Sequence, residues 1–156
     1  MDPSEAQTGL LRLLADHEEA MSELYRAYAA HLREEADFWM ELAAEEAVHL
    51  EMVRRLGREV ADGQARLESR RFSLESVEAS LAHIRAETRR AETEKTSRAY
   101  ALSMAMDIEN GLIERKYFEA FDGDSKNARA VLNALARGTF AHLERVRQAW
   151  EKLQRG

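Results

Sequence analysis

The chain has 156 residues, no cysteine and a net charge of −6, with 45% hydrophobic and 33% charged residues. Without thiolates it can form neither a disulfide nor a cysteine-ligated zinc, iron–sulfur or rubredoxin-type iron site. Its acidity predicts no nucleic-acid or anionic-membrane partner, because phosphate binding requires a basic surface.

The length suits a single domain over residues 1–156, and the sequence predicts a cytoplasmic protein. No stretch approaches the roughly 20 apolar residues that a membrane-spanning helix needs. The N-terminal residues MDPSEAQTGL are acidic, and they lack the basic start and apolar core of a signal peptide.

The residue composition favours helix along nearly the whole chain, because Ala, Leu, Glu and Arg dominate and Pro3 is the only proline. Apolar residues at alternating spacings of three and four predict four long helices, over residues 4–33, 37–60, 93–121 and 125–154. Asp37 is the expected N-cap of the second helix, and Asp124 or Ser125 that of the fourth. The turn sequence FDGDS is expected to end the third.

The connections between these helices differ in length. Helices one and two, and helices three and four, are predicted to be joined by only a few residues, which makes each pair an antiparallel hairpin. Residues 61–92 form a long crossover with a short amphipathic segment that Ser73 could cap, and this segment carries Leu74, Val77, Leu81 and Ile84. Such a crossover can return the third helix parallel to the second. The sequence therefore predicts an all-α, ferritin-like four-helix bundle rather than an up-and-down bundle with short loops.

Polar residues interrupt the apolar stripe of every predicted helix. They are Glu18 in the first, Glu46 and His49 in the second, Glu109 in the third, and Thr139 and His142 in the fourth. Heights can be counted from the two expected hairpin turns at about 1.5 Å per residue. On this count the polar residues of the first two helices lie within about a turn of one another, and those of the last two are offset by somewhat more. The three glutamates and two histidines are thus predicted to meet at one level of the bundle.

This combination of buried donors indicates a metal site. A carboxylate buried without a partner costs several kcal/mol, so a counter-ion, a proton or a metal must accompany it. Oxygen and nitrogen donors without sulfur suit iron or manganese, with zinc also possible. Glu46 and His49 form a Glu-x-x-His pair on one helical face. A lone pair of this kind is weak evidence in a Glu-rich chain. The predicted ligand set is larger, comprising Glu18, Glu46, His49, Glu109 and His142.

These residues resemble the pattern of the rubrerythrin-like branch of the ferritin-like superfamily, over essentially the whole chain. Members have a Glu in helix one with a Tyr two turns later, matched by Glu18 and Tyr25 in EEAMSELY. Glu46 and His49 match the Glu-x-x-His of helix two. Glu109 in MDIENGLIERKYF matches the Glu of helix three, and TFAH, which ends in His142, corresponds to the second Glu-x-x-His in helix four.

Thr139 departs from this family pattern, because it stands where members have a carboxylate. A neutral hydroxyl is a poor ligand and cannot bridge two cations. Three interpretations follow: two metal ions with water in place of the missing ligand, one metal ion, or a metal-free relic whose polar groups hydrogen-bond one another. Two iron ions are the leading expectation.

The resemblance implies a non-haem iron protein that oxidises ferrous iron, or that reduces peroxide, with oxygen or peroxide as the oxidant. The rubredoxin domain of full-length rubrerythrins is lacking, so sustained peroxide reduction would need an external electron donor. The alternative is a metal-free ferritin-like bundle that serves as a helical interaction module. A homodimer through an apolar helix face is expected. Hydrolysis is disfavoured, because no nucleophile motif is present.

Further polar residues fall off the apolar stripes and are predicted to lie outside the site. Five glutamates are interpreted as surface charge: Glu19, Glu23, Glu45, Glu114 and Glu144. Three histidines are left out of the ligand set, namely His17, His31 and His83. Trp39 and Trp150 are interpreted as core or interface packing.

Overall fold

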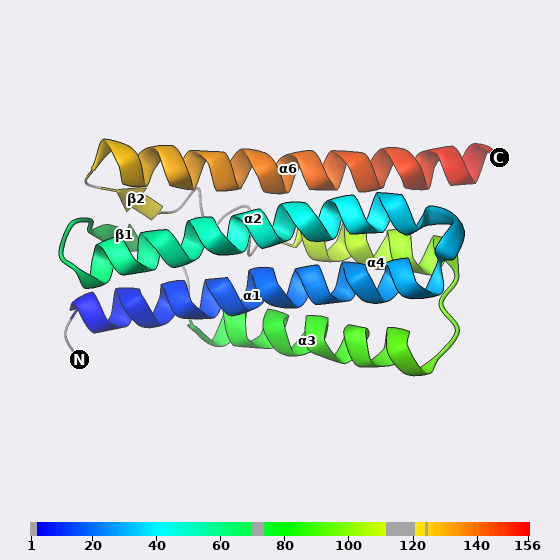
Figure 1. The fold of residues 1–156 in the computed structure, drawn as a ribbon, viewed down its shortest axis with the longest axis horizontal. Coiled ribbons are helices and arrows are strands. Elements are labelled where there is room, and N and C mark those ends of the chain that lie inside the picture. The colour runs from blue at the N-terminus through cyan, green and yellow to red at the C-terminus, as the bar shows by residue number, and fades with distance from the viewer. Residues whose placement is uncertain (1–2, 70–73, 112–120, 124) are drawn as a thin grey trace.

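The computed structural model describes residues 3–69, 74–111, 121–123 and 125–156 (Figure 1). Its elements in chain order are α1 (Pro3–His31), η1 (Arg33–Glu35), α2 (Ala36–Ala61), β1 (Leu67–Ser69), α3 (Leu74–Thr93), α4 (Arg98–Asn110), β2 (Phe121–Gly123) and α6 (Lys126–Arg155). The predicted all-α class is confirmed, apart from one short strand pair that the apolar periodicity does not reveal. None of these helices is long and apolar enough to cross a membrane.

The helices lie along the long axis of the molecule (Figure 1). The 3-10 turn η1 joins α1 to α2, and these two helices pack against each other in opposite directions. The helix α3 packs on α1, and α4 packs against α6. Because α3 carries the chain back along the molecule, α4 runs in the same direction as α2, while α1 and α6 run in the other.

The ends of α1, α2 and α6 fall within two residues of the predicted ranges. Ser125 caps α6, since its Oγ accepts a hydrogen bond from the backbone N–H of Ala128 at 3.0 Å. The prediction for Asp37 is wrong. Glu35 is the N-cap residue of α2 and makes no side-chain capping bond, because η1 leads directly into the helix.

The prediction of one long third helix over residues 93–121 is wrong in three respects. Thr93 ends α3, and α4 begins only after Ser97, whose Oγ accepts from the Tyr100 N–H at 3.1 Å. Gly111 then ends α4. A Cβ on Gly111 would lie 2.8 Å from the Ile108 carbonyl oxygen, so this turn requires glycine. Phe121 lies in β2 rather than in a helix. The predicted stripe beyond residue 111 falls mainly outside the described residues.

The crossover also differs from its prediction. Its amphipathic segment is the 20-residue α3, which extends to Thr93, and Val77, Leu81 and Ile84 are buried as predicted. Leu74 is exposed, and Ser73 lies outside the described residues. The FDGDS sequence does not form a simple turn, because residues 121–123 pair antiparallel with β1 in the register Leu67↔Gly123. The segment between α4 and α6 is therefore more than the predicted few-residue loop.

Two apolar clusters pack on either side of a polar level within the molecule. One contains Tyr25, Tyr28 and Trp39 among its members, and the other contains Leu14, Val53, Leu56 and Leu135. Between them, at residues 18, 46, 49, 139 and 142, the helices carry polar side chains that are 8% exposed or less. With Glu109, these residues are called the polar layer below. The surrounding apolar packing keeps this layer away from solvent.

Trp39 is the largest fully buried side chain, and its ring centroid lies 4.9–5.6 Å from those of Tyr25, Tyr28 and Phe38. We predict that Trp39→Ala lowers the free energy of unfolding by about 3–5 kcal/mol, because it leaves a cavity in this cluster. Urea unfolding followed by circular dichroism measures the loss. Met40→Ala, at a neighbour that is 46% exposed, should change stability by less than about 0.5 kcal/mol. Equal losses in the two variants would contradict this packing.

Candidate metal centre

The structure places all five predicted ligand residues in the buried polar layer, and they come from four different helices. Glu18 comes from α1, Glu46 and His49 from α2, Glu109 from α4, and His142 from α6. His49 is 8% exposed and the other four are 2% or less. Each of these residues lies on the apolar stripe of its helix, which repeats every three or four residues, so its side chain points inward.

Glu46 lies at the centre of the layer. Its Oε1 is 3.0 Å from His142 Nδ1, and its Oε2 is 3.2 Å from His49 Nδ1. Burial raises the pKa of Glu46, but hydrogen bonds from His142 and His49, and a further one from Glu18, outweigh it. The pKa of this carboxyl group therefore lies well below its usual range, and Glu46 is ionised.

Glu109 joins the layer from the side of α4. Its Oε1 accepts a hydrogen bond from the Tyr25 hydroxyl at 2.5 Å and lies 3.7 Å from His142 Nδ1. Tyr25 is fully buried in the aromatic cluster beside Trp39. It therefore fixes the Glu109 carboxylate from the apolar side of the site.

Gly138 makes room for His49, and sequence reasoning missed this role. A Cβ on Gly138 would lie 2.4 Å from His49 Nε2, which is too short for two atoms that are not bonded to each other. The imidazole rings of His49 and His142 stack with centroids 5.0 Å apart. The available signal was a glycine inside a strongly periodic helix, which often marks a close approach.

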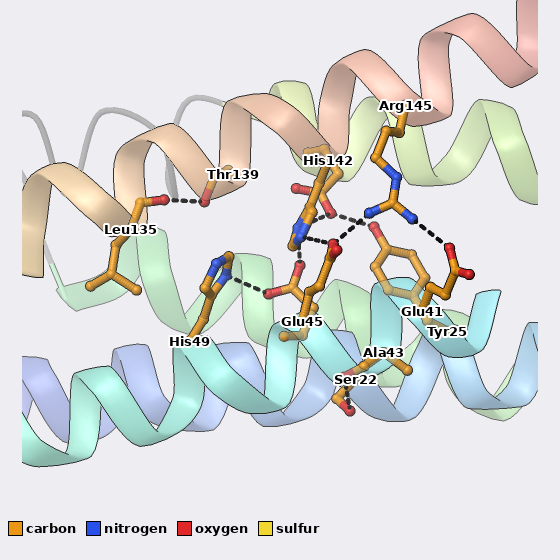
Figure 2. A network of polar contacts seen from close by, with 12 residues as sticks. Ser22, Tyr25, Glu41, Ala43, Glu45, His49, Leu135, Thr139, His142 and Arg145 are labelled. Atoms are coloured by element: carbon orange, nitrogen blue, oxygen red, sulfur yellow. Dashed lines mark hydrogen bonds and ion pairs between the residues drawn. The ribbon is translucent and has the colours of Figure 1, made fainter. Parts of the chain in front are cut away.

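Thr139 turns its hydroxyl to its own helix. The Oγ1 donates to the Leu135 carbonyl oxygen at 3.0 Å, one turn earlier in α6 (Figure 2). The residue is 1% exposed, so it is buried within the polar layer. Its hydrogen bond is the usual one for a threonine in a helix interior.

Glu45 was predicted to be surface charge outside the site, and the structure shows a partly exposed side chain that nevertheless contacts a residue of the site. Its side chain is 46% exposed, yet its Oε2 lies 2.7 Å from His142 Nε2. The guanidinium of Arg145 contacts the same oxygen at 2.6 Å (Figure 2). Sequence reasoning missed Glu45 because it lies beside the apolar stripe rather than on it. His17, which was predicted to lie outside the site, places its Nε2 3.0 Å from Ser80 Oγ on α3.

The geometry is suited to a cation. Glu46, His49 and His142 each offer one ligand atom, and these atoms lie within 4.8 Å of one another. Oxygen and imidazole nitrogen donors match the preferences of iron, manganese and zinc. Within the part of the chain that the structure describes, these three form the group that could hold a metal ion.

Comparisons with known proteins identify no relative: no protein-family model, curated protein or solved structure matches the chain. A metal centre is therefore indicated by three features of the molecule itself: the burial of the polar layer, the distances around Glu46 and the chemistry of the donors.

The contact at Gly138 leads to a test of how His49 is positioned. We predict that Gly138→Ala moves the His49 ring away from His142, because the new methyl group occupies the place of Nε2. Proton contacts between the two rings, measured by NMR, should be lost. The matched control is Gly57→Ala in α2, where a Cβ would lie 3.9 Å from Leu11 Cβ. It should keep the ring contacts and gain about 0.5–1 kcal/mol from helix propensity. Unchanged ring contacts in Gly138→Ala would refute this role.

The lowered pKa of Glu46 makes stability depend on pH. Ionised Glu46 stabilises the folded chain fully above the usual pKa of 4.5, and this contribution is lost as pH falls through the lowered value. We therefore predict that, without added metal, the free energy of unfolding falls more steeply below about pH 4.5 in the wild type than in Glu46→Gln. Urea unfolding at pH 7 and at several values below pH 4.5 measures both slopes. Parallel curves would mean that Glu46 is not stabilised as an anion.

Proposed function

We propose that this chain is a non-haem iron-binding protein with a ferritin-like four-helix bundle of the rubrerythrin-like type. Three observations support the bundle. Ligand residues come from α1, α2, α4 and α6, α4 runs in the direction of α2, and residues 62–97 separate those two helices. This order is that of a bundle with one long crossover, in which α3 is the helix of the crossover.

The observation that carries the metal proposal is the position of Glu46. Its two carboxylate oxygens face different histidines, with Nδ1 atoms at 3.0 and 3.2 Å. A carboxylate in this position could be a ligand for one ion or for two. Glu109 would supply further negative charge, and Glu18 would do so once it had lost the proton of its hydrogen bond to Glu46. Two ferrous ions held by Glu18, Glu46, His49, Glu109 and His142 are therefore the arrangement we propose.

The residues present fit iron, with one ligand fewer than the family pattern. Three carboxylates and two imidazoles face one another in a site closed to bulk water, and none of the donors is sulfur. Thr139 adds no charge, so two ions would be held less tightly than by four carboxylates. One ion bound by Glu46, His49 and His142 is the alternative stoichiometry, because their ligand atoms lie within 4.8 Å of one another.

Iron bound here would supply oxidation chemistry, either ferrous-iron oxidation by oxygen or peroxide reduction. The protein residues exclude water, hold the ligands in place and offset the metal charge. Tyr25 fixes Glu109 through its 2.5 Å hydrogen bond. Because the chain has no cysteine, repeated turnover with peroxide would draw electrons from an external donor.

A metal-free interaction module is the second candidate. Two observations favour it: Thr139 replaces a ligand, and the two oxygens of the buried Glu46 carboxylate each have a histidine of the chain as hydrogen-bond partner. The apolar residues Met40 and Val48 are 46% and 59% exposed on α2 and could contribute to a homodimer interface. In this case the polar layer would contribute to fold specificity rather than to chemistry.

Metal stoichiometry tests the iron proposal directly. We predict about two irons per chain, by elemental analysis after anaerobic ferrous loading of protein purified without a metal-affinity tag. The double variant Glu46→Ala, His49→Ala should lose this iron, because it removes the central carboxylate and one imidazole. Glu51→Ala, an exposed α2 glutamate beside Arg54, is the matched control and should retain it.

Each alternative result has a defined meaning. About one iron per chain that is lost in the double variant would establish the single-ion site. No iron after loading would favour the metal-free module. Thr139→Glu separates the cases further, because a restored carboxylate should tighten iron binding in a functional centre and leave a relic unable to bind. Iron that persists in the double variant would exclude the assigned ligands.

A further inference from the structure

Both ring nitrogens of His142 face carboxylates. On the inner side, Nδ1 lies 3.0 Å from Glu46 Oε1 and 3.7 Å from Glu109 Oε1. On the outer side, Nε2 lies 2.7 Å from Glu45 Oε2. The inner nitrogen thus points into the polar layer, and the outer nitrogen points to the one carboxylate of this group that reaches solvent.

A histidine can bind a metal ion through only one of its two nitrogens in a given orientation. The nitrogen that binds must be free of a proton, and the other then carries the N–H and requires an acceptor. In this site Nδ1 is on the side of Glu46 and Glu109, where an ion would lie. Glu45 is the acceptor available to Nε2 on the opposite side.

Glu45 is itself held in place. Arg145 on α6 contacts Glu45 through Nη1 at 2.6 Å and Glu41 through Nη2 at 3.2 Å, so its guanidinium spans two carboxylates one helical turn apart on α2 (Figure 2). His142 and Arg145 are three residues apart and lie on the same side of α6. The Oε2 atom of Glu45 is therefore held between the Arg145 guanidinium and His142 Nε2.

We propose that Glu45 is a positioning residue, which holds His142 in the orientation and tautomer that present Nδ1 to the metal. This inference rests on the proposed metal-binding function. Glu45 acts through His142 and does not itself bind the ion. The two adjacent glutamates of the EEAVH sequence then have different roles. Glu46 is a ligand, and Glu45 positions a ligand on another helix.

The test compares Zn²⁺ and anaerobic Fe²⁺ affinity by calorimetry in four proteins. Glu45→Ala should weaken binding about 10- to 100-fold with unchanged stoichiometry, as losses of such support typically do. Glu45→Gln keeps an oxygen that can accept from Nε2 and should recover most of that loss. Glu51→Ala, another partly exposed glutamate on α2, should match the wild type. Equal affinity in Glu45→Ala and the wild type would overturn the proposal.

A second readout separates positioning from a general structural effect. Long-range ¹⁵N–¹H spectra of the imidazoles in the Zn²⁺-loaded protein should show His142 protonated at Nε2 in the wild type. In Glu45→Ala the Nε2 proton should exchange faster with water, while the His49 signals stay in place. Unchanged Nε2 exchange would overturn the role of Glu45.

The two proposals fail in different ways. If the wild type binds neither Zn²⁺ nor Fe²⁺, the metal-binding function fails. The same spectra of the metal-free protein then decide whether Glu45 holds His142. A slowly exchanging Nε2 proton that depends on Glu45 supports the positioning role, and one that does not depend on Glu45 overturns it.

Discussion

The arrangement of this molecule depends on one buried carboxylate, that of Glu46. Removing such a group from water is costly, and the cost is offset only when hydrogen-bond donors or cations meet both oxygens. Here His49 and His142 meet them from different helices. The relative position of α2 and α6 is therefore specified by a polar contact as well as by apolar packing. Apolar side chains alone would tolerate several alignments of these helices, whereas the Glu46 contacts favour one.

Support for the site is layered from inside to outside. Glu46 and the histidines form its centre, Tyr25 fixes Glu109 from the aromatic cluster, and Glu45 contacts His142 from the exposed side. The inner contacts are shielded by two apolar clusters, so their electrostatic strength is greater than at the surface. The outer pair of Glu45 and Arg145 is partly solvated and individually weaker. Its effect depends on being aligned with the buried histidine.

The sequence was sufficient for the inward residues and insufficient for the connections. Periodicity places Glu18, Glu46, Glu109 and His142 on apolar stripes, and a helix of known rise then predicts their common height. Periodicity could not reveal that α4 ends at Asn110, because the apolar pattern continues past that point while Gly111 adopts the turn. It also could not reveal Glu45 or Gly138. One acts from beside the stripe through another side chain, and the other acts by lacking a side chain.

The pairing of β1 with β2 has a consequence for how the chain assembles. The α1–α2 hairpin brings Glu18, Glu46 and His49 together through contacts that are close in sequence. Glu109 and His142 come from helices that follow the crossover, and β2 pairs with β1 just before α6 begins. Closing a long loop costs entropy before its contacts are gained, so hairpin formation is expected to precede it. The pairing of β1 with β2 is therefore expected to bring the start of α6 to an α1–α2 hairpin that has already formed.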